Sequence, residues 1–250
     1  MLKSLLGSIT FYTIIPLPNN WEKSFQSIAA WSPVVGLLIG TILGLVDYLL
    51  IFIGFPILIR STLIVFLGIL ITGGLHLDGV IDSADGITLS DPQKKLMAMQ
   101  DSSVGAFGVI AGIMVILLKV VALSAIHNYR LWILMITYAW GRWAQLFSIT
   151  FYTYLKKAGK GLFHKQYINY PNDLLFGTIN LLIINILWMI FTSHQEILGI
   201  IIMITGIIIS VGISYFFNKQ FEGHTGDTYG AVVEWTESLI LCLLVLYFSG

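Results

Sequence analysis

The chain has 250 residues, of which 57% are hydrophobic and 10% are charged, and its 13 Lys and Arg residues balance its 13 Asp and Glu residues. A soluble domain usually carries about 25% charged residues. This composition excludes a disordered chain, and the single cysteine, Cys242, excludes a secreted domain held together by disulfides. The lack of a basic excess argues against nucleic-acid binding, so we expect a membrane protein.

Seven apolar segments approach or exceed the length of about 20 residues that a helix needs to cross a bilayer. They predict an all-α, polytopic membrane bundle that forms one domain, residues 1–250. The segments are Pro33–Phe55, Pro56–Leu75, Gly105–Ile126, Leu131–Tyr152, Leu174–Thr192, Ile197–Phe217 and Val232–Phe248. A shorter apolar run, Leu5–Leu17, comes before them. We expect it to be an interfacial or re-entrant helix rather than a signal peptide, because no cleavage pattern follows it.

The charges between the segments predict the orientation of the chain. If the N-terminus is on side one, that side receives nine lysines and side two receives only Arg60 and Arg130. The nine are Lys3, Lys23, Lys94, Lys95, Lys156, Lys157, Lys160, Lys165 and Lys219. Basic loops stay in the cytoplasm, so we expect loops 76–104, 153–173 and 218–231 on the cytoplasmic face.

The first of these loops has the densest cluster of acidic residues. Asp78, Asp82 and Asp85 are spaced i, i+4, i+7, which places three carboxylates on one face of a helix. Hard oxygen ligands grouped in this way suit Mg²⁺ or Mn²⁺, and the simpler interpretation is a solvated acidic face. Gly79 and Gly86 would let a ligand approach closely, although glycine also ends helices.

Three further aspartates each have a structural alternative. Asp91, followed by Pro92, is expected to cap a short helix. Asp101 either caps the third apolar segment or adds a fourth carboxylate to the acidic face. Asp227 ends the sequence Gly223-His224-Thr225-Gly226-Asp227, which could present backbone amides to a phosphate or form an ordinary turn capped by Asp227. If the turn is functional, the last segment should pack against the second and third segments and bring Asp227 near the acidic face.

A few charged residues fall inside apolar segments, where charge is costly and is functional by default. Glu234, Glu237 and Arg142 are the main examples, with an Arg–Glu pair as the structural explanation, while Asp47 and Lys119 look more isolated. The glycine-rich basic loop, residues 156–165, either faces lipid headgroups or captures an anionic substrate.

Four blocks in this order resemble the cobalamin synthase family, the adenosylcobinamide-GDP ribazoletransferases. The blocks are Ile15-Pro16-Leu17-Pro18 with Trp31–Gly40, Leu75–Gly86, Asp91–Gly108, and His224–Asp227 with Gly230, Ala231, Glu234 and Glu237. Two features depart from the family pattern. Ile14 stands where an arginine is expected, and the basic loop is rich in lysine rather than carrying an arginine and a Gly-Leu-Gly element.

The resemblance implies a multi-pass transferase of the bacterial or archaeal cytoplasmic membrane with its active site on the cytoplasmic face. It would join adenosylcobinamide-GDP to α-ribazole or α-ribazole 5′-phosphate, release GMP and use Mg²⁺, with Mn²⁺ as a substitute. The ribazole 5′-hydroxyl would attack the phosphorus next to cobinamide, and a carboxylate or His76 would take its proton. A homo-oligomer or an association with other cobalamin-assembly enzymes is compatible with this activity.

The expected site residues fall into three groups. The catalytic residues would be His76, Asp82 and Asp85. The metal ligands would be Asp78, Asp82, Asp85, Asp101 and Asp227. The residues that contact the bound groups would be Gly79, Gly86, Ser102, Thr225 and Gly226.

Two other functions are weighed against this one. A CDP-alcohol phosphotransferase also combines an aspartate-rich motif with a divalent metal, but it needs Ala-Arg after the first Asp-Gly, and Val80-Ile81 stands there instead. A cation-coupled transporter could use Asp47, Arg142, Glu234 and Glu237, but the densest acids lie at a membrane surface and no inverted repeat is evident.

Overall fold

The computed structural model describes residues 2–157, 159–192 and 196–248. These residues form helices, and their one β feature is an isolated bridge between Tyr154 and His224. The elements are α1 (Leu2–Tyr12), η1 (Ile28–Trp31), α2 (Ser32–Ile53), α3 (Ile57–Ile71), α4 (Leu75–Ile87), α5 (Pro92–Ala98), α6 (Ala106–Ala125), α7 (Arg130–Phe151), α8 (Lys160–Tyr167), α9 (Asn172–Phe191), α10 (Glu196–Phe221) and α11 (Gly226–Phe248). The predicted helical membrane bundle is confirmed.

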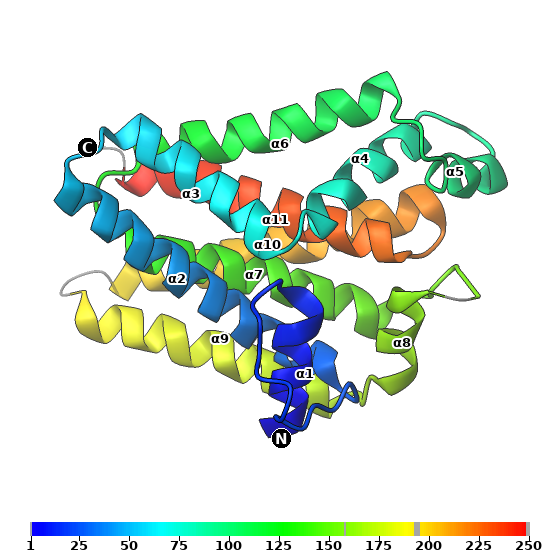
Figure 1. The fold of residues 1–250 in the computed structure, drawn as a ribbon, viewed down its shortest axis with the longest axis horizontal. Coiled ribbons are helices and arrows are strands. Elements are labelled where there is room, and N and C mark those ends of the chain that lie inside the picture. Colours follow the sequence, from blue (N-terminus) through cyan, green and yellow to red (C-terminus); the bar gives the residue numbers. More distant parts are fainter. Residues whose placement is uncertain (1, 158, 193–195, 249–250) are drawn as a thin grey trace.

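The number of membrane crossings stays a prediction. Within the described residues, five helices are long and apolar enough to span: α2 with η1, α6, α9, α10 and α11. A sixth crossing would come from α3 and α4, which meet at a bend of 89°. α7 coincides with the fourth predicted segment, but it is more polar. It runs through the middle of the bundle against α2, α9, α10 and α11, where its polar residues meet protein rather than lipid (Figure 1).

The N-terminal helix α1 is too short to cross the membrane. Its 11 residues extend about 16 Å, roughly half of the hydrocarbon core. It packs on η1 and the start of α2, which agrees with an interfacial or re-entrant helix.

Glycines allow α2 to pack closely against α7. Gly36, Gly40 and Gly44 repeat every four residues along one face of α2, and a Cβ atom at any of them would overlap α7 between Leu131 and Ala139. Small residues at this spacing let two helix backbones approach, which is how helices associate where lipid provides no hydrophobic driving force. This contact fixes the centre of the bundle.

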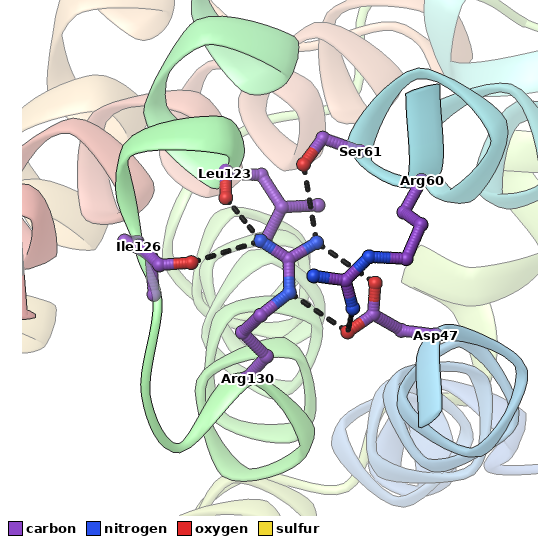
Figure 2. Close-up of polar contacts among 6 residues, drawn as sticks. All are labelled: Asp47, Arg60, Ser61, Leu123, Ile126 and Arg130. Carbon is purple, nitrogen blue, oxygen red and sulfur yellow. Dashed lines mark hydrogen bonds and ion pairs between the residues drawn. The ribbon is translucent and has the colours of Figure 1, made fainter. Parts of the chain in front are cut away.

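Two groups of buried ions join the helices. Near one end, Arg130 forms ion pairs with both oxygens of Asp47 at 2.7 and 2.8 Å and donates to Ser61 (Figure 2). Arg130 also donates to the carbonyl of Leu123 in the last turn of α6 and to the carbonyl of Ile126, the C-cap residue of that helix. Asp47 is therefore paired, and the expectation that it is isolated is wrong.

The second group lies deeper in the bundle. Lys119 of α6 contacts Glu234 at 2.5 Å and Glu237 at 2.6 Å, both on α11, and all three side chains are buried. The expected Arg–Glu pair is therefore wrong, because the two glutamates bind Lys119. Arg142 instead contacts His76.

The three longest predicted loops meet at one end of the bundle, which we call the loop end. Lys95 Nζ donates to Gln220 O at 2.6 Å, which joins the first loop to the third. Leu155 N donates to His224 O and His224 N to Thr153 O, each at 2.8 Å, which joins the second loop to the third. The grouping agrees with the charge count, while the cytoplasmic location of this end stays a prediction.

We predict that Arg130→Gln destabilises the bundle far more than Arg60→Gln. Removing Arg130 leaves Asp47 and two helix-end carbonyls buried without their main partner, which should cost about 3–5 kcal/mol. Arg60 has one long contact to Asp47, at 3.4 Å. Thermal unfolding in detergent would measure both variants, and equal losses of stability would contradict the assigned role of Arg130.

We also predict that the loop end faces the cytoplasm. In a Cys242→Ser background, single cysteines at the exposed positions Ser90, Lys157 and Lys219 should react with an impermeant maleimide only after cells are permeabilised. A cysteine at exposed Asn128, near the opposite end, should react in intact cells. Reaction of any loop-end cysteine in intact cells would contradict the predicted cytoplasmic location of the loop end.

Candidate functional site

The acidic helix α4 crosses the start of α11 at very close range. A Cβ atom at Gly79 would overlap the backbone of Asp227, and one at Gly230 would lie 2.9 Å from the Cα of His76. α11 also packs against α6. The prediction that the last segment brings Asp227 beside the acidic face is therefore confirmed, with α4 rather than α3 as its neighbour.

The close crossing gives Gly79 a packing role. Gly86 likewise lies against Met99 and Lys95 of the first loop. These protein contacts explain why both positions lack a side chain, and direct contact of either glycine with a ligand stays a prediction.

Asp78 and Asp82 are the accessible members of the acidic face. Asp78 is exposed and Asp82 is half-buried, and α4 lies outside the five apolar helices. Burial, with a further contribution from the carboxylates of Asp78 and Asp227, raises the pKa of Asp82 to about 7. Like charges at close range favour binding of a cation or a proton, so this part of the surface is suited to a divalent ion.

Asp85 has a different environment. Its carboxylate accepts hydrogen bonds from the backbone amides of Gly105 and Gly108, both at 2.7 Å. These amides belong to the start of α6, whose N-cap residue is Gly105. Asp85 therefore caps α6 from a neighbouring helix, at the end that favours negative charge. The absence of side chains at the two glycines makes room for the carboxylate.

Asp101 and Ser102 lie in the exposed connection between α5 and α6. The Asp101 carboxylate accepts from the amide of Ser103 at 2.9 Å and from its hydroxyl at 2.5 Å. The alternative that Asp101 caps α6 is wrong, because Gly105 occupies that position. Asp91 does cap α5, and accepts from the amides of Gln93 and Lys94.

The turn before α11 is closed by threonines. Thr225 Oγ1 accepts from Thr228 N at 3.2 Å, and Thr228 Oγ1 accepts from Thr225 N at 2.8 Å, which is the reciprocal pattern of a capping box. The alternative that Asp227 is the cap is therefore wrong. Its carboxylate instead forms an ion pair with Lys156 of the basic loop at 2.7 Å.

His224 in the same turn is a structural residue. Its Nε2 donates to Ser214 O at 3.2 Å and its Nδ1 lies 3.1 Å from Thr228 Oγ1. Burial lowers its pKa to about 4, so the ring stays neutral and joins α10 to the start of α11.

A cavity of about 240 Å³ opens beside the Lys156–Asp227 pair. Aromatic side chains from several elements form its walls, and polar side chains lie among them. The lining residues are Phe11, Tyr12, Leu75, His76, Gln145, Tyr154, Lys156, Gly159, Gly161, His164, Gly226, Asp227 and Tyr229. His76, Gly226 and Asp227 are thus the predicted site residues that share this cavity.

Arg142 lies fully buried beneath the cavity. Its Nη1 donates to His76 Nε2 at 3.0 Å and to Gln145 Oε1 at 3.4 Å, and its guanidinium lies 4.8 Å from the centre of the Tyr12 ring. The His164 ring stacks on the Tyr12 ring, with 5.4 Å between the ring centroids. Burial, and then the charge of Arg142, lowers the pKa of His164 to about 4, so its ring is neutral.

The donor set fits a shared divalent ion better than a protein cage. Within the described residues, no group of three His, Cys, Asp or Glu side chains is placed to hold a metal ion. Asp78, Asp82 and Asp227 nevertheless offer hard oxygen donors beside one another. Mg²⁺ typically keeps several waters and uses one or two carboxylates together with substrate phosphates, so a closed cage is not required.

The sequence did not indicate the aromatic residues of the cavity. Tyr12, Tyr154, His164 and Tyr229 come from four separate parts of the chain, and a sequence rich in aromatic residues gives no reason to select them. Gln145 had a weak signal, because it lies three residues from Arg142 on the same face of α7.

Comparison with known proteins identifies relatives over the whole length. The sequence model described as cobalamin-5-phosphate synthase matches residues 4–245. A protein of Trichormus variabilis named adenosylcobinamide-GDP ribazoletransferase is 48% identical over 246 residues, which cover 98% of each chain. Proteins of the same name from Synechococcus sp. and Synechocystis sp. are each 43% identical, over 94% and 97% of this chain and 93% and 94% of their own. No solved structure matches the chain.

We predict that Thr225→Ala lowers the stability of the fold by about 1 kcal/mol, because the capping box at α11 is lost. Asp227→Asn should cost less, since its ion pair is partly exposed and such pairs contribute about 0–1 kcal/mol. Thermal unfolding followed by tryptophan fluorescence would compare the two. A larger loss for Asp227→Asn would show that the carboxylate holds the helix start.

Proposed function

Because the chain belongs to the cobalamin-5-phosphate synthase family, and is thus a transferase of cobalamin biosynthesis, we propose that it joins adenosylcobinamide-GDP to α-ribazole or α-ribazole 5′-phosphate and releases GMP. The observation that carries the proposal is the meeting of the α4 carboxylates with the Lys156–Asp227 pair at the mouth of the cavity. A diphosphate substrate needs both a cation and a basic side chain near its phosphates, and this arrangement combines carboxylates that suit a divalent cation with the basic side chain of Lys156.

The reaction replaces the phosphoanhydride bond of the diphosphate with a phosphate ester to the ribazole 5′-oxygen. The ribazole 5′-oxygen bonds to the phosphorus that carries cobinamide, the bond from that phosphorus to the GMP oxygen breaks, and GMP leaves. The hydroxyl proton passes to a carboxylate. Mg²⁺, or Mn²⁺ in its place, would be held by one or two of the carboxylates of Asp78, Asp82 and Asp227 together with the substrate phosphates, and would neutralise charge on the diphosphate. Lys156 would add a fixed positive charge on the same side.

His76 is poorly suited to be the base. Arg142 can only donate, so His76 Nε2 must accept, and a neutral ring then carries its proton on Nδ1. A second proton would place an imidazolium directly against a buried guanidinium. We therefore assign proton removal to Asp227 or Asp82, both near the cavity mouth.

The two alternative functions, a cation-coupled transporter and a CDP-alcohol phosphotransferase, have less support. Asp47, Glu234 and Glu237 are engaged by buried arginine and lysine side chains, which explains these charges without transport. The relatives described above are ribazoletransferases, and nothing in the site favours a CDP-linked lipid substrate. The family and the apolar helices support a multi-pass membrane protein, and we propose that it lies in a bacterial or archaeal cytoplasmic membrane with its site open to the cytoplasm.

We predict that Asp82→Asn lowers GMP release by about 100-fold or more, because it removes a charged oxygen donor with little change of shape. The assay incubates the purified protein in detergent with adenosylcobinamide-GDP, α-ribazole and Mg²⁺, and measures GMP. The wild-type protein should release GMP, and omission of the divalent cation should stop it.

Asp91→Asn is the matched control. Asn is also a good N-cap, so α5 should form normally and activity should stay within about twofold of the wild type. Normal activity of Asp82→Asn at moderate Mg²⁺ concentrations would show that the acidic face is only a solvated helix surface. The lack of GMP from the wild-type protein would refute the proposed function itself.

A further inference from the structure

The cavity beneath the Lys156–Asp227 pair has the character of a site for a flat heterocycle. Tyr12, Tyr154, Tyr229 and His164 contribute rings to its walls, and burial keeps His164 neutral. Aromatic walls stack on planar rings, and such stacking is worth about 1–3 kcal/mol for a nucleic-acid base. A purely electrostatic phosphate site would not need these walls.

Two buried polar atoms of the lining have no hydrogen-bond partner among the described residues. They are Nδ1 of His76, whose residue is 2% exposed, and the hydroxyl of Tyr229, whose residue is 1% exposed. An unmade hydrogen bond inside a protein costs about 1–3 kcal/mol, so buried polar atoms without partners call for a ligand or an ordered water. Both residues line the same cavity.

The contact with Arg142 fixes the role of His76 Nδ1. Every N–H of a guanidinium is a donor, so the contact at 3.0 Å makes Nε2 the acceptor of the imidazole. The neutral ring then carries its hydrogen on Nδ1. His76, one of the residues that line the cavity, therefore carries a fixed N–H donor on Nδ1 that has no acceptor among the described residues.

We propose that this cavity binds the base of the ribazole substrate, with the dimethylbenzimidazole ring stacked among the aromatic side chains and its unsubstituted ring nitrogen accepting a hydrogen bond from His76 Nδ1. The inference rests on the proposed function and adds to it the location of the nucleophilic substrate. A base bound here directs its ribose toward the cavity mouth, where Asp227 can take the proton of the 5′-hydroxyl.

The hydrogen-bonding inventory favours this base over guanine. The base of an N-linked benzimidazole has one acceptor nitrogen and no donor, and the rest of its surface is apolar. Guanine offers two donor groups along one edge, which a protein usually satisfies with a carboxylate. Asp227 is the carboxylate among the lining residues, and the proposed function already assigns it to the metal ion or to proton removal.

The first test needs no substitution. The wild-type enzyme is compared with α-ribazole and with the matching 5,6-dimethylindole riboside, in which a C–H replaces the acceptor nitrogen. The indole nucleoside leaves the His76 donor unsatisfied, so its KM should be about 10- to 100-fold higher. The KM for adenosylcobinamide-GDP should be the same with either nucleoside.

Two variants then identify the donor. His76→Gln places an oxygen where Nε2 accepts from Arg142 but has no donor at Nδ1, whereas His76→Asn places an amide N–H close to the position of Nδ1. His76→Gln should raise the KM for α-ribazole by about 10- to 100-fold and abolish the preference over the indole nucleoside. His76→Asn should retain that preference. An unchanged KM for adenosylcobinamide-GDP would show that both variants are folded.

The outcomes separate this inference from the proposed function. GMP release at equal KM with both nucleosides would overturn the inference and leave the function standing. A change confined to the KM for adenosylcobinamide-GDP would instead assign the cavity to the other substrate. No GMP with α-ribazole would refute both.

Discussion

The cost of burying charge within an apolar bundle organises this structure. An unpaired ion away from water is so unfavourable that each buried charge needs partners on neighbouring helices. Lys119 joins α6 to two glutamates of α11, and Arg130 joins Asp47 of α2 to the end of α6 and the start of α7. Apolar contacts alone would let neighbouring helices shift along one another. These ion pairs fix the relative positions of the helices, and the loops of the loop end connect helices held in this way.

Close backbone packing then determines where the acidic helix lies. Gly79 and Gly230 let α4 and α11 touch, and Asp85 caps α6 at two glycine amides. The acidic face is thereby held beside Asp227, while Thr225 and Thr228 close the helix start and the Asp227 carboxylate pairs with Lys156. The aspartates that appear equivalent in the sequence have different environments: Asp85 caps α6, Asp78 is exposed, and Asp82 is half-buried beside Asp227.

The site divides its chemistry between two environments. Carboxylates and the partly exposed Lys156 lie at the accessible mouth of the cavity. Neutral aromatic rings and His76, whose ring is held by Arg142, lie inside the cavity, where burying a charged group of a substrate would be costly. A nucleoside has a flat apolar base and a polar ribose. It therefore matches a cavity that is aromatic inside and polar at its mouth, which is the physical reason for the proposed position of the nucleoside.

The sequence by itself determined the helical membrane bundle, the acidic face on α4, the cap at Asp91 and the grouping of the loops, because periodicity, spacing and charge bias are local properties of the chain. It could not determine that Asp85 would cap α6 or that Thr225 rather than Asp227 would cap α11. It also could not determine that Glu234 and Glu237 would form ion pairs with Lys119 rather than with Arg142. The aromatic cavity was equally hidden, since its walls come from distant segments. Such choices depend on which groups meet after packing, when several partners of similar chemistry compete for one buried position, and only the tertiary structure resolves that competition.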